Sequence, residues 1–278
     1  MTMRPSDVLR RASAYLERHE VESPDATAER LLMHVLRTDR AGLYTRSSGL
    51  DTLEAKLFGR ALCQRCAGTP LQHLTGEQAF RRLVLEVRPG VFVPRPETEI
   101  VVEHAVAQIV DVASPFVVDV GTGTGAIGLA IADEHPGATV VAIDRDPAAV
   151  DLARGNARRL GIEVTVLEGD LLGPLADASR GSVDLVVSNP PYVAPRDLAV
   201  LPLEVRADPE LALAGGLEIY ERLADQAHAC LRFGGWLVLE IGASMAEEVT
   251  RLLANAFTDV RVERDLAGRD RVVLARRP

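Results

Sequence analysis

A run of closely spaced glycines is the first feature of this sequence that points to chemistry. Gly121-Thr122-Gly123-Thr124-Gly125 follows an apolar segment that ends in Asp119-Val120. Glycines in such a run let the backbone turn tightly between a strand and a helix and approach a ligand closely. The next apolar segment ends at Asp144, 23 positions after Gly121, where a carboxylate can accept hydrogen bonds from ribose hydroxyls. We therefore expect a cofactor that carries a nucleoside.

Two classes of cofactor fit this run. Gly121, Gly123 and Ala126 satisfy the dinucleotide pattern G-x-G-x-x-[GA]. Asp119 favours the other class, because a carboxylate two residues before the loop suits an ammonium group better than a pyrophosphate. S-adenosylmethionine (SAM) carries such an ammonium group, so we expect SAM rather than a nicotinamide dinucleotide.

The tetrapeptide Asn189-Pro190-Pro191-Tyr192 is the second feature with chemical potential, and it also follows an apolar segment. The side-chain oxygen of Asn189 and the carbonyl of Pro190 would offer two acceptors to one planar NH₂ group, and Tyr192 could pack on its face. An amide or exocyclic amine is a poor nucleophile because its lone pair is delocalised. Two acceptors can orient such a nitrogen and stabilise positive charge developing on it. The pattern therefore indicates N-methylation, without a strong base, because the proton can leave after transfer.

The elements that must position these residues alternate in type along the C-terminal part of the chain. Helical segments at 146–160 and 217–231 separate short apolar runs that suit strands buried on both faces. Such strands are expected at 116–120, 140–143, 164–167, 185–187, 236–241, 260–262 and 272–275. This alternation predicts an α/β fold with a doubly wound parallel sheet, which binds ligands beyond the carboxyl ends of its strands.

The N-terminal part of the chain carries signals for helices rather than for alternating strands and helices. Helix-start signals at Ser6-Asp7, Ser23-Pro24-Asp25 and Asp51 predict three helices within residues 1–75. Alternating apolar residues over 79–94, with a turn at Pro89-Gly90, predict a β-hairpin between the two parts.

Composition bounds the class of protein. The chain has 278 residues, 47% of them hydrophobic and 26% charged, which excludes a disordered, collagen-like or disulfide-scaffold protein. No apolar run approaches the ~18 residues of a membrane span. No secretory signal is apparent and there are three cysteines, so we expect a cytoplasmic location. Cys63 and Cys66 lack the further ligands that a structural zinc needs, so no metal is expected.

The net charge of −9 is unevenly distributed. Residues 1–115 carry 15 basic and 15 acidic side chains, whereas residues 116–278 carry 16 and 25. Proteins that bind duplex nucleic acid usually carry a cluster of basic residues on the binding surface. The distribution therefore counts against direct DNA binding.

Taken together, these motifs resemble the HemK/PrmC family of protein-glutamine N5-methyltransferases, which act on peptide chain release factors. Within the matching stretches, the run Pro94-Arg95-Pro96-Glu97-Thr98-Glu99 joined to N-terminal helices is more specific than Asn189–Tyr192, which nucleic-acid amino-methyltransferases share. The matching stretches are Pro70–Glu77, Val93–Glu99, Gly121–Gly125, Asn189–Tyr192, Leu211–Gly216, Gly234–Leu237 and Glu240–Gly242. The resemblance implies a helical substrate-docking domain at 1–75, a β-hairpin linker at 76–95 and a seven-stranded class I SAM-dependent methyltransferase domain at 96–278.

The resemblance also implies a site and its partners. The substrate would be the glutamine of the Gly-Gly-Gln motif of class 1 release factors, the products the N5-methylated glutamine and S-adenosylhomocysteine, and the enzyme a monomer. The implied substrate site comprises Phe92, Asn189, Pro190, Pro191 and Tyr192, with Asn189, Pro190 and Tyr192 as the catalytic residues. The implied SAM site comprises Arg95, Glu97, Thr98, Asp119, Gly121, Thr122, Gly123, Thr124, Gly125, Asp144, Asp170, Leu171 and Asn189. Asp170-Leu171 would contact adenine, and some members have an aromatic residue where this chain has Leu171.

Three other functions stay open at this point. The nearest is a SAM-dependent N-methyltransferase that acts on an exocyclic amine of a nucleic-acid base through the same tetrapeptide. A second is a non-catalytic module that binds a release factor. A third is a nicotinamide-dependent dehydrogenase, which would leave Asn189–Tyr192 and Pro94–Glu99 without a role.

Overall fold

The computed structural model describes residues 3–175 and 177–278, which form two compact units. The first unit comprises the residues up to Glu77 together with Pro202–Ala207, and the second comprises Gln78–Leu201 and Asp208–Pro278. Within the described ranges, no helix has both the length and the apolar content needed to cross a membrane.

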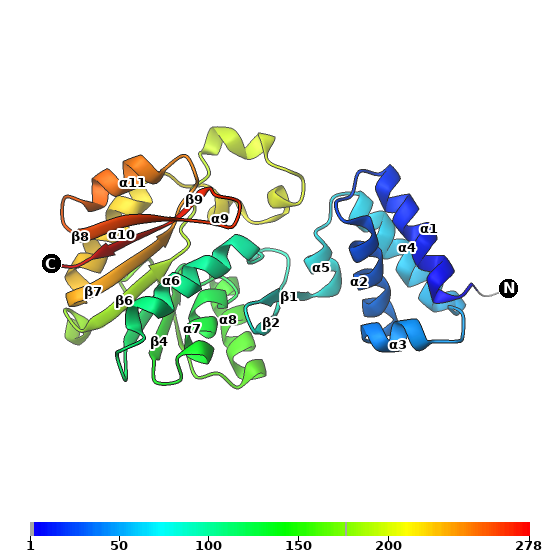
Figure 1. The fold of residues 1–278 in the computed structure, drawn as a ribbon, viewed down its shortest axis with the longest axis horizontal. Helices are drawn as coiled ribbons and strands as arrows, with labels where there is room; N and C mark the ends of the chain where they lie inside the picture. The colour runs from blue at the N-terminus through cyan, green and yellow to red at the C-terminus, as the bar shows by residue number, and fades with distance from the viewer. Residues whose placement is uncertain (1–2, 176) are drawn as a thin grey trace. The chain divides into compact units, whose positions relative to one another are not determined.

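The first unit is helical, as the sequence predicts (Figure 1). Its core is built from apolar side chains such as Leu16, Leu31, Leu43 and Phe58. The helices are α1 (Pro5–Arg18), α2 (Pro24–Leu36), α3 (Arg40–Thr45), α4 (Thr52–Cys66) and α5 (Leu71–Thr75). Helices α3 and α5 were not expected, because each is too short to show a periodic apolar stripe. Helix α1 begins at Pro5, with Arg4 at the N-cap in place of the expected Ser6-Asp7.

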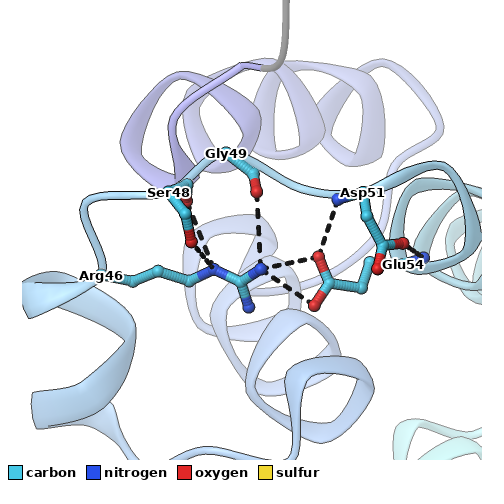
Figure 2. Close-up of polar contacts among 5 residues, drawn as sticks. All are labelled: Arg46, Ser48, Gly49, Asp51 and Glu54. Carbon is cyan, nitrogen blue, oxygen red and sulfur yellow. Dashed lines mark hydrogen bonds and ion pairs between the residues drawn. The ribbon is translucent and has the colours of Figure 1, made fainter.

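The Glu54 carboxylate fixes both the start of α4 and the loop before it (Figure 2). The Asp51 side chain accepts a hydrogen bond from the Glu54 N–H, and the Glu54 carboxylate accepts one from the Asp51 N–H, both at 2.8 Å. This is a capping box, which satisfies two backbone donors at the helix start. Arg46 then donates to both Glu54 oxygens, at 2.9 and 2.8 Å. The loop from Arg46 to Asp51 is thereby tied to the helix that it precedes.

A late segment of the chain completes the helical unit. Pro202–Ala207 belongs to this unit although in the sequence it lies between the two parts of the second unit. Within it, Glu204 forms an ion pair with Arg65, a buried residue near the end of α4. A buried guanidinium needs such a partner, because desolvation of an unpaired charge is costly.

The second unit contains a seven-stranded sheet in the order β5-β4-β3-β6-β7-β9-β8. Its strands are β3 (Phe116–Val120), β4 (Thr139–Asp144), β5 (Thr165–Glu168), β6 (Val183–Ser188), β7 (Leu231–Glu240), β8 (Thr258–Arg264) and β9 (Asp270–Arg276). All seven expected strands are present, and the first five pair in parallel. Strand β9 is antiparallel to both of its neighbours, so the sheet is mixed rather than wholly parallel. The connection between β8 and β9 is too short for the crossover that a parallel pair needs.

Helices cover both faces of this sheet (Figure 1). Successive residues of β7 show the alternation, because Leu237 and Leu239 pack on one side and Val238 on the other. Helices α10 (Leu217–Cys230) and α11 (Ala246–Leu253) contribute to the first core, and α6 (Glu99–Ile109) and α7 (Ala126–Glu134) to the second. The remaining elements include α8 (Pro147–Leu160), α9 (Glu210–Leu213) and the 3₁₀ turns η1 (Pro96–Thr98), η2 (Asp177–Ser179), η3 (Pro195–Val200) and η4 (Val205–Ala207). This arrangement is the class I SAM-dependent methyltransferase fold that we expected.

The hairpin is present, but its turn lies elsewhere than predicted. Strands β1 (Glu77–Phe80) and β2 (Leu83–Glu86) meet at Arg81-Arg82 rather than at Pro89-Gly90. Arg81 takes a φ of 52°, its N–H donates to Glu99, and its guanidinium donates to both oxygens of Glu134 at 2.7 and 2.6 Å. These long-range contacts outweigh the local turn signal. The expected strand at 91–93 is an irregular segment instead.

Candidate functional site

The two motifs of the sequence lie at neighbouring points of one sheet edge. Strands β3 and β6 pair in parallel, with Val120 opposite Ser188. The Ser188 hydroxyl donates to the Val120 carbonyl at 2.7 Å. The glycine run therefore leaves β3 beside the point where Asn189 leaves β6, as the sequence predicts for a site at the carboxyl ends of the strands.

The glycine loop leaves open space beside its backbone. Gly121 and Gly123 have φ values of 71° and 55°, and a Cβ atom on either would meet no atom within 4 Å. By contrast, a Cβ on Gly125 would lie 2.8 Å from the Leu129 side chain, so this glycine serves packing. The first two glycines thus leave the backbone accessible to a ligand.

The Asp119 side chain holds this loop in place through hydrogen bonds. Its side chain is completely buried, and Oδ2 accepts hydrogen bonds from the Thr122 hydroxyl at 2.5 Å and the Gly128 N–H at 2.9 Å. Burial raises its pKa to about 6. Among the described residues, no donor reaches Oδ1. Oδ1 is therefore the oxygen of this carboxylate that can accept a hydrogen bond from a ligand.

Asp144 stands at the end of β4, against the same loop. Its Oδ2 accepts a hydrogen bond from the Gly123 N–H at 2.8 Å, and its Oδ1 accepts one from the Asp146 N–H at 2.9 Å. Burial raises the pKa of this carboxyl group as well. Each carboxylate oxygen has a second lone pair for a ribose hydroxyl. The orphaned Asp119 oxygen, the open space at the glycines and the Asp144 carboxylate together fit SAM.

Asp170 and Leu171 lie beyond β5, and both have side chains that are engaged with the protein itself. Asp170 is exposed and forms an ion pair with Arg222. Leu171 has a φ of 52° and packs its side chain into the core. Its side chain is thus committed to packing, and its backbone is the part that a ligand can use.

The tetrapeptide is held by hydrogen bonds at both of its ends. The Asn189 Nδ2 donates to the Thr98 hydroxyl at 3.3 Å. At the other end, the Tyr192 hydroxyl donates to Glu240 Oε1 at 3.4 Å. Thr98 is buried and bonded to Asn189, so it supports the tetrapeptide in addition to any contact with the cofactor.

Two glycines allow other segments to approach the tetrapeptide closely. A Cβ on Gly215 would lie 1.9 Å from the Pro191 carbonyl oxygen, and a Cβ on Gly242 would lie 3.2 Å from the Tyr192 ring. Gly215 also donates its N–H to the Val193 carbonyl at 3.0 Å. The glycines of Leu211–Gly216 and Glu240–Gly242 thus shape the segment that carries the tetrapeptide.

Glu240 is a further buried acid, next to the tetrapeptide, and was not among the predicted site residues. It ends β7 and is 2% exposed. The Thr98 hydroxyl acts to lower the pKa of this carboxyl group, against the larger effect of burial. Burial raises its pKa to about 7, and burial together with the Glu240 charge raises the pKa of Tyr192 to about 12. The Tyr220 hydroxyl donates to the Glu240 carbonyl at 2.9 Å, which anchors this end of β7.

Phe92 and Arg95 form a further group with an acid that sequence analysis missed. The Arg95 guanidinium lies 5.3 Å from the centre of the Phe92 ring and forms an ion pair with Asp208. The Asp208 side chain is fully buried and also accepts a hydrogen bond from the Val93 N–H at 3.1 Å. Glu97 is exposed nearby, and its charge acts on both Glu240 and Tyr192.

The structure shows no candidate metal site among the described residues, where no three histidine, cysteine or acidic side chains group suitably. Cys63 and Cys66 are free thiols of α4.

Comparisons with known proteins match both parts of the chain. A family described as the PrmC N-terminal domain matches residues 7–76, and one described as the methyltransferase small domain matches residues 85–204. The release factor glutamine methyltransferase of Moorella thermoacetica is 42% identical over 266 residues, covering 92% of this chain and 93% of the relative. Its counterpart in Deinococcus radiodurans is 41% identical over 281 residues, with 99% of each chain covered.

Solved structures share the fold over about three quarters of this chain, at lower identity. A T. thermophilus 16S rRNA N2 G1207 methyltransferase, solved with AdoMet and guanosine, has a TM-score of 0.57 and 21% identity, covering 73% of this chain and 50% of that one. The catalytic domain of hMettl16 also has a TM-score of 0.57, with 16% identity and coverage of 77% and 81%.

Proposed function

Because this chain belongs to the family of release factor glutamine methyltransferases, we propose that it methylates the N5 side-chain amide nitrogen of the Gly-Gly-Gln glutamine in class 1 release factors. The observation that carries this proposal is the pairing of β3 with β6, which starts the glycine loop and the Asn189 tetrapeptide side by side. A SAM-binding loop and a pair of amide acceptors at one edge suit transfer to a planar nitrogen.

The residues that would hold SAM are those of the loop and its acids. Asp119 Oδ1 would accept from the ammonium group, the backbone at Gly121 and Gly123 would face the methionine part, and Asp144 would accept from the ribose. When bound, SAM supplies an electrophilic methyl group on a sulfonium sulfur. Hydrogen bonds hold both acids against the loop, from Thr122 and Gly128 to Asp119 and from Gly123 to Asp144.

The tetrapeptide would bind and orient the substrate. Asn189 Oδ1 and the Pro190 carbonyl would each accept one N–H of the glutamine amide, which would fix the plane of the amide and so direct one face of its nitrogen toward the methyl donor. The same two oxygens would stabilise the positive charge that develops on nitrogen. Tyr192 and Phe92 would pack against the glutamine side chain, and the amide would lose its extra proton to water after transfer.

The helical unit is proposed to dock the release factor, in a cytoplasmic enzyme that works as a monomer. The boundaries proposed for docking domain, linker and methyltransferase domain are 1–75, 76–95 and 96–278. The short segment Pro202–Ala207 would assist, because the Arg65–Glu204 ion pair makes it part of the docking unit.

Intact-mass analysis of a cognate release factor incubated with the protein and SAM tests the proposal. We expect a gain of one methyl group that maps to the Gly-Gly-Gln glutamine. A factor carrying alanine at that glutamine serves as the matched control and should gain nothing. Total RNA and DNA are offered as competing acceptors, and methyl transfer to nucleic acid alone would replace this proposal with an exocyclic-amine methyltransferase.

A further inference from the structure

The Asp208 carboxylate holds the irregular segment that precedes η1. Its Oδ1 accepts a hydrogen bond from the Val93 N–H at 3.1 Å, and its Oδ2 forms an ion pair with the Arg95 guanidinium. The two donors lie 115 and 113 positions before the acid in the sequence. The Asp208 side chain is fully buried, and a buried charge needs such partners in place of water. An acid from a distant part of the chain therefore fixes this segment.

Phe92 lies between two anchored residues of the same segment. Val91 is buried and packs against Ala149 of α8, and Val93 is buried and bonded to Asp208 through its N–H. The Phe92 side chain itself is only half-buried. Its ring has the Arg95 guanidinium 5.3 Å from its centre. The backbone on both sides of Phe92 is thus fixed by the core, and Arg95 is the contact that acts on the ring.

Arginine is the side chain that can serve a ring and an acid at once. Its planar guanidinium can lie over an aromatic ring while its N–H groups donate to a carboxylate. Arg95 does both, with Phe92 as the ring and Asp208 as the acid. The positive charge of Arg95 is thereby compensated within the protein. Arg95 is thus engaged with a residue of the proposed substrate site.

The stretch of chain that begins at Asp208 also reaches the tetrapeptide. It continues through α9, where the Leu213 carbonyl accepts a hydrogen bond from the Val193 N–H at 2.9 Å. Val193 directly follows Tyr192, the last residue of the tetrapeptide. One short stretch therefore binds the segment before η1 at its start and the chain that leaves the tetrapeptide at its end. Both of these partners carry residues proposed to contact the glutamine.

We propose that Asp208 is a positioning residue for the substrate glutamine, which acts through Arg95 to hold the Phe92 ring in place relative to the tetrapeptide. Arg95 accordingly serves the substrate, although the family resemblance implies a place for it at the cofactor. This inference rests on the proposed function, because that function assigns Phe92 to the glutamine side chain. It adds to that function an acid outside the glycine loop and the tetrapeptide.

Kinetic measurements on the full chain separate the substrate from the cofactor. Asp208→Asn keeps an acceptor for the Val93 N–H and removes the charge that holds Arg95. It should lower kcat for a release factor about tenfold to a hundredfold, because a displaced ring no longer orients the glutamine. The Kd for SAM should change less than about threefold. Glu247→Gln removes the acid of an exposed ion pair with Arg251 on α11, and this control should change neither quantity.

Substitutions of Arg95 test whether the acid acts through it. Arg95→Lys keeps a charge for Asp208 but loses the planar group over Phe92, so its kcat should lie between those of Arg95→Gln and the wild type. Arg95→Gln combined with Asp208→Asn should lose no more turnover than about the worse single variant, since both changes remove the same contact. If Asp208→Asn fails to fold, the two Arg95 variants carry the kinetic test.

A fluorine label on the Phe92 ring gives a measurement that needs no turnover. With para-fluorophenylalanine in place of Phe92, the fluorine NMR signal should shift in Asp208→Asn and stay unchanged in Glu247→Gln. An unshifted signal in Asp208→Asn, or wild-type kcat in that variant, would overturn the inference. So would a loss of SAM affinity that matches the loss of turnover, because it would assign Arg95 to the cofactor. Failure of the wild type to methylate a release factor would instead overturn the proposed function, and the fluorine signal would still show whether Asp208 positions the ring.

Discussion

The Asn156 side chain joins helix α8 to the glycine loop, because its Nδ2 donates a hydrogen bond of 2.9 Å to the Thr124 carbonyl. The same side chain pairs with the backbone of Glu86 in the hairpin, accepting at 2.8 Å and donating at 3.0 Å. Asn156 is fully buried, so no water replaces these bonds when the side chain is shortened. One residue therefore fixes the glycine loop to two elements that are distant in sequence.

Replacement of Asn156 by alanine should weaken SAM binding and reduce stability. The change leaves the buried Thr124 carbonyl and the half-buried N–H and carbonyl of Glu86 without their Asn156 partner. A polar group left buried and unsatisfied costs about 1–3 kcal/mol. Isothermal titration should show weaker SAM binding, and chemical denaturation should show a lower free energy of unfolding. Asn255→Ala, at an exposed position after α11, is the matched control and should change neither quantity. SAM affinity equal to the wild type in Asn156→Ala would show that the loop holds its shape without this brace.

Replacement of Asp144 by asparagine should act on the cofactor and leave the methyl-transfer step unchanged. The new NH₂ group faces either the Gly123 N–H or the Asp146 N–H, which both donate to the carboxylate in the wild type. Loss of one charge-assisted acceptor costs about 1.5–3 kcal/mol, so the Kd for SAM should rise roughly tenfold to a hundredfold. Turnover at saturating SAM should stay near the wild-type value. Asp151→Asn, on the exposed side of α8, is the control. An unchanged Kd would place the ribose elsewhere.

Replacement of Asn189 by alanine should lower turnover and leave SAM affinity nearly unchanged. It removes an acceptor that acts when charge develops on nitrogen, so kcat should fall roughly a hundredfold or more. The Kd for SAM should change little, because the residues proposed to hold the cofactor lie mainly in the loop after β3 and at the end of β4. Single-turnover kinetics with saturating SAM would measure the effect on the methyl-transfer step. An equal loss of SAM affinity and turnover would assign Asn189 to the cofactor instead.

Much of the fold could be predicted from the sequence because its signals are local. The apolar run Phe116–Val120 is a strand buried on both faces, and near-continuous apolar runs are typical of such strands. The cap at Asp51 is also local, because all of its partners lie within eight residues. The hairpin turn was misplaced because Arg81 is fixed by Glu134, 53 residues away, and no short pattern records that contact.

The residues of the site also divide into those with a local sequence signal and those fixed by long-range contacts. The glycine run and the tetrapeptide are short patterns, and their meeting follows from the order of parallel strands. Their supporting residues are not predictable in this way. Asp208 binds the Val93 N–H across 115 residues, and Glu240 receives the Tyr192 hydroxyl across 48. One signal could have identified Glu240: it is an acidic residue in an otherwise apolar run. A buried acid needs a partner.

Gly215 and Gly216 offer a matched pair of substitutions in one loop. A Cβ at Gly215 would meet the Pro191 carbonyl oxygen at 1.9 Å, whereas a Cβ at Gly216 would meet no atom within 4 Å. Gly215→Ala must displace the tetrapeptide, and a shift of about 1 Å there can cost roughly a hundredfold in rate. Gly216→Ala should keep wild-type turnover. Methylation assays on both variants, with SAM affinity as a check on the loop, would measure the difference. Equal turnover in the two variants would show that the tetrapeptide tolerates the displacement.

The buried acid Glu240 should also make stability depend on pH. Its pKa is raised by burial from an ordinary value of 4.5 to about 7, so the folded state favours the protonated form. Its favourable contribution is therefore complete below about pH 4.5 and is lost as pH rises through about 7. The shift corresponds to about 3 kcal/mol. Glu240→Gln carries no charge at any pH, so its free energy of unfolding relative to the wild type should increase by about this amount between pH 4 and pH 8. Urea denaturation at several pH values measures that difference, with Glu248→Gln as the control in which it stays constant. A Glu240→Gln difference that stays constant would mean that Glu240 has an ordinary pKa in the folded protein.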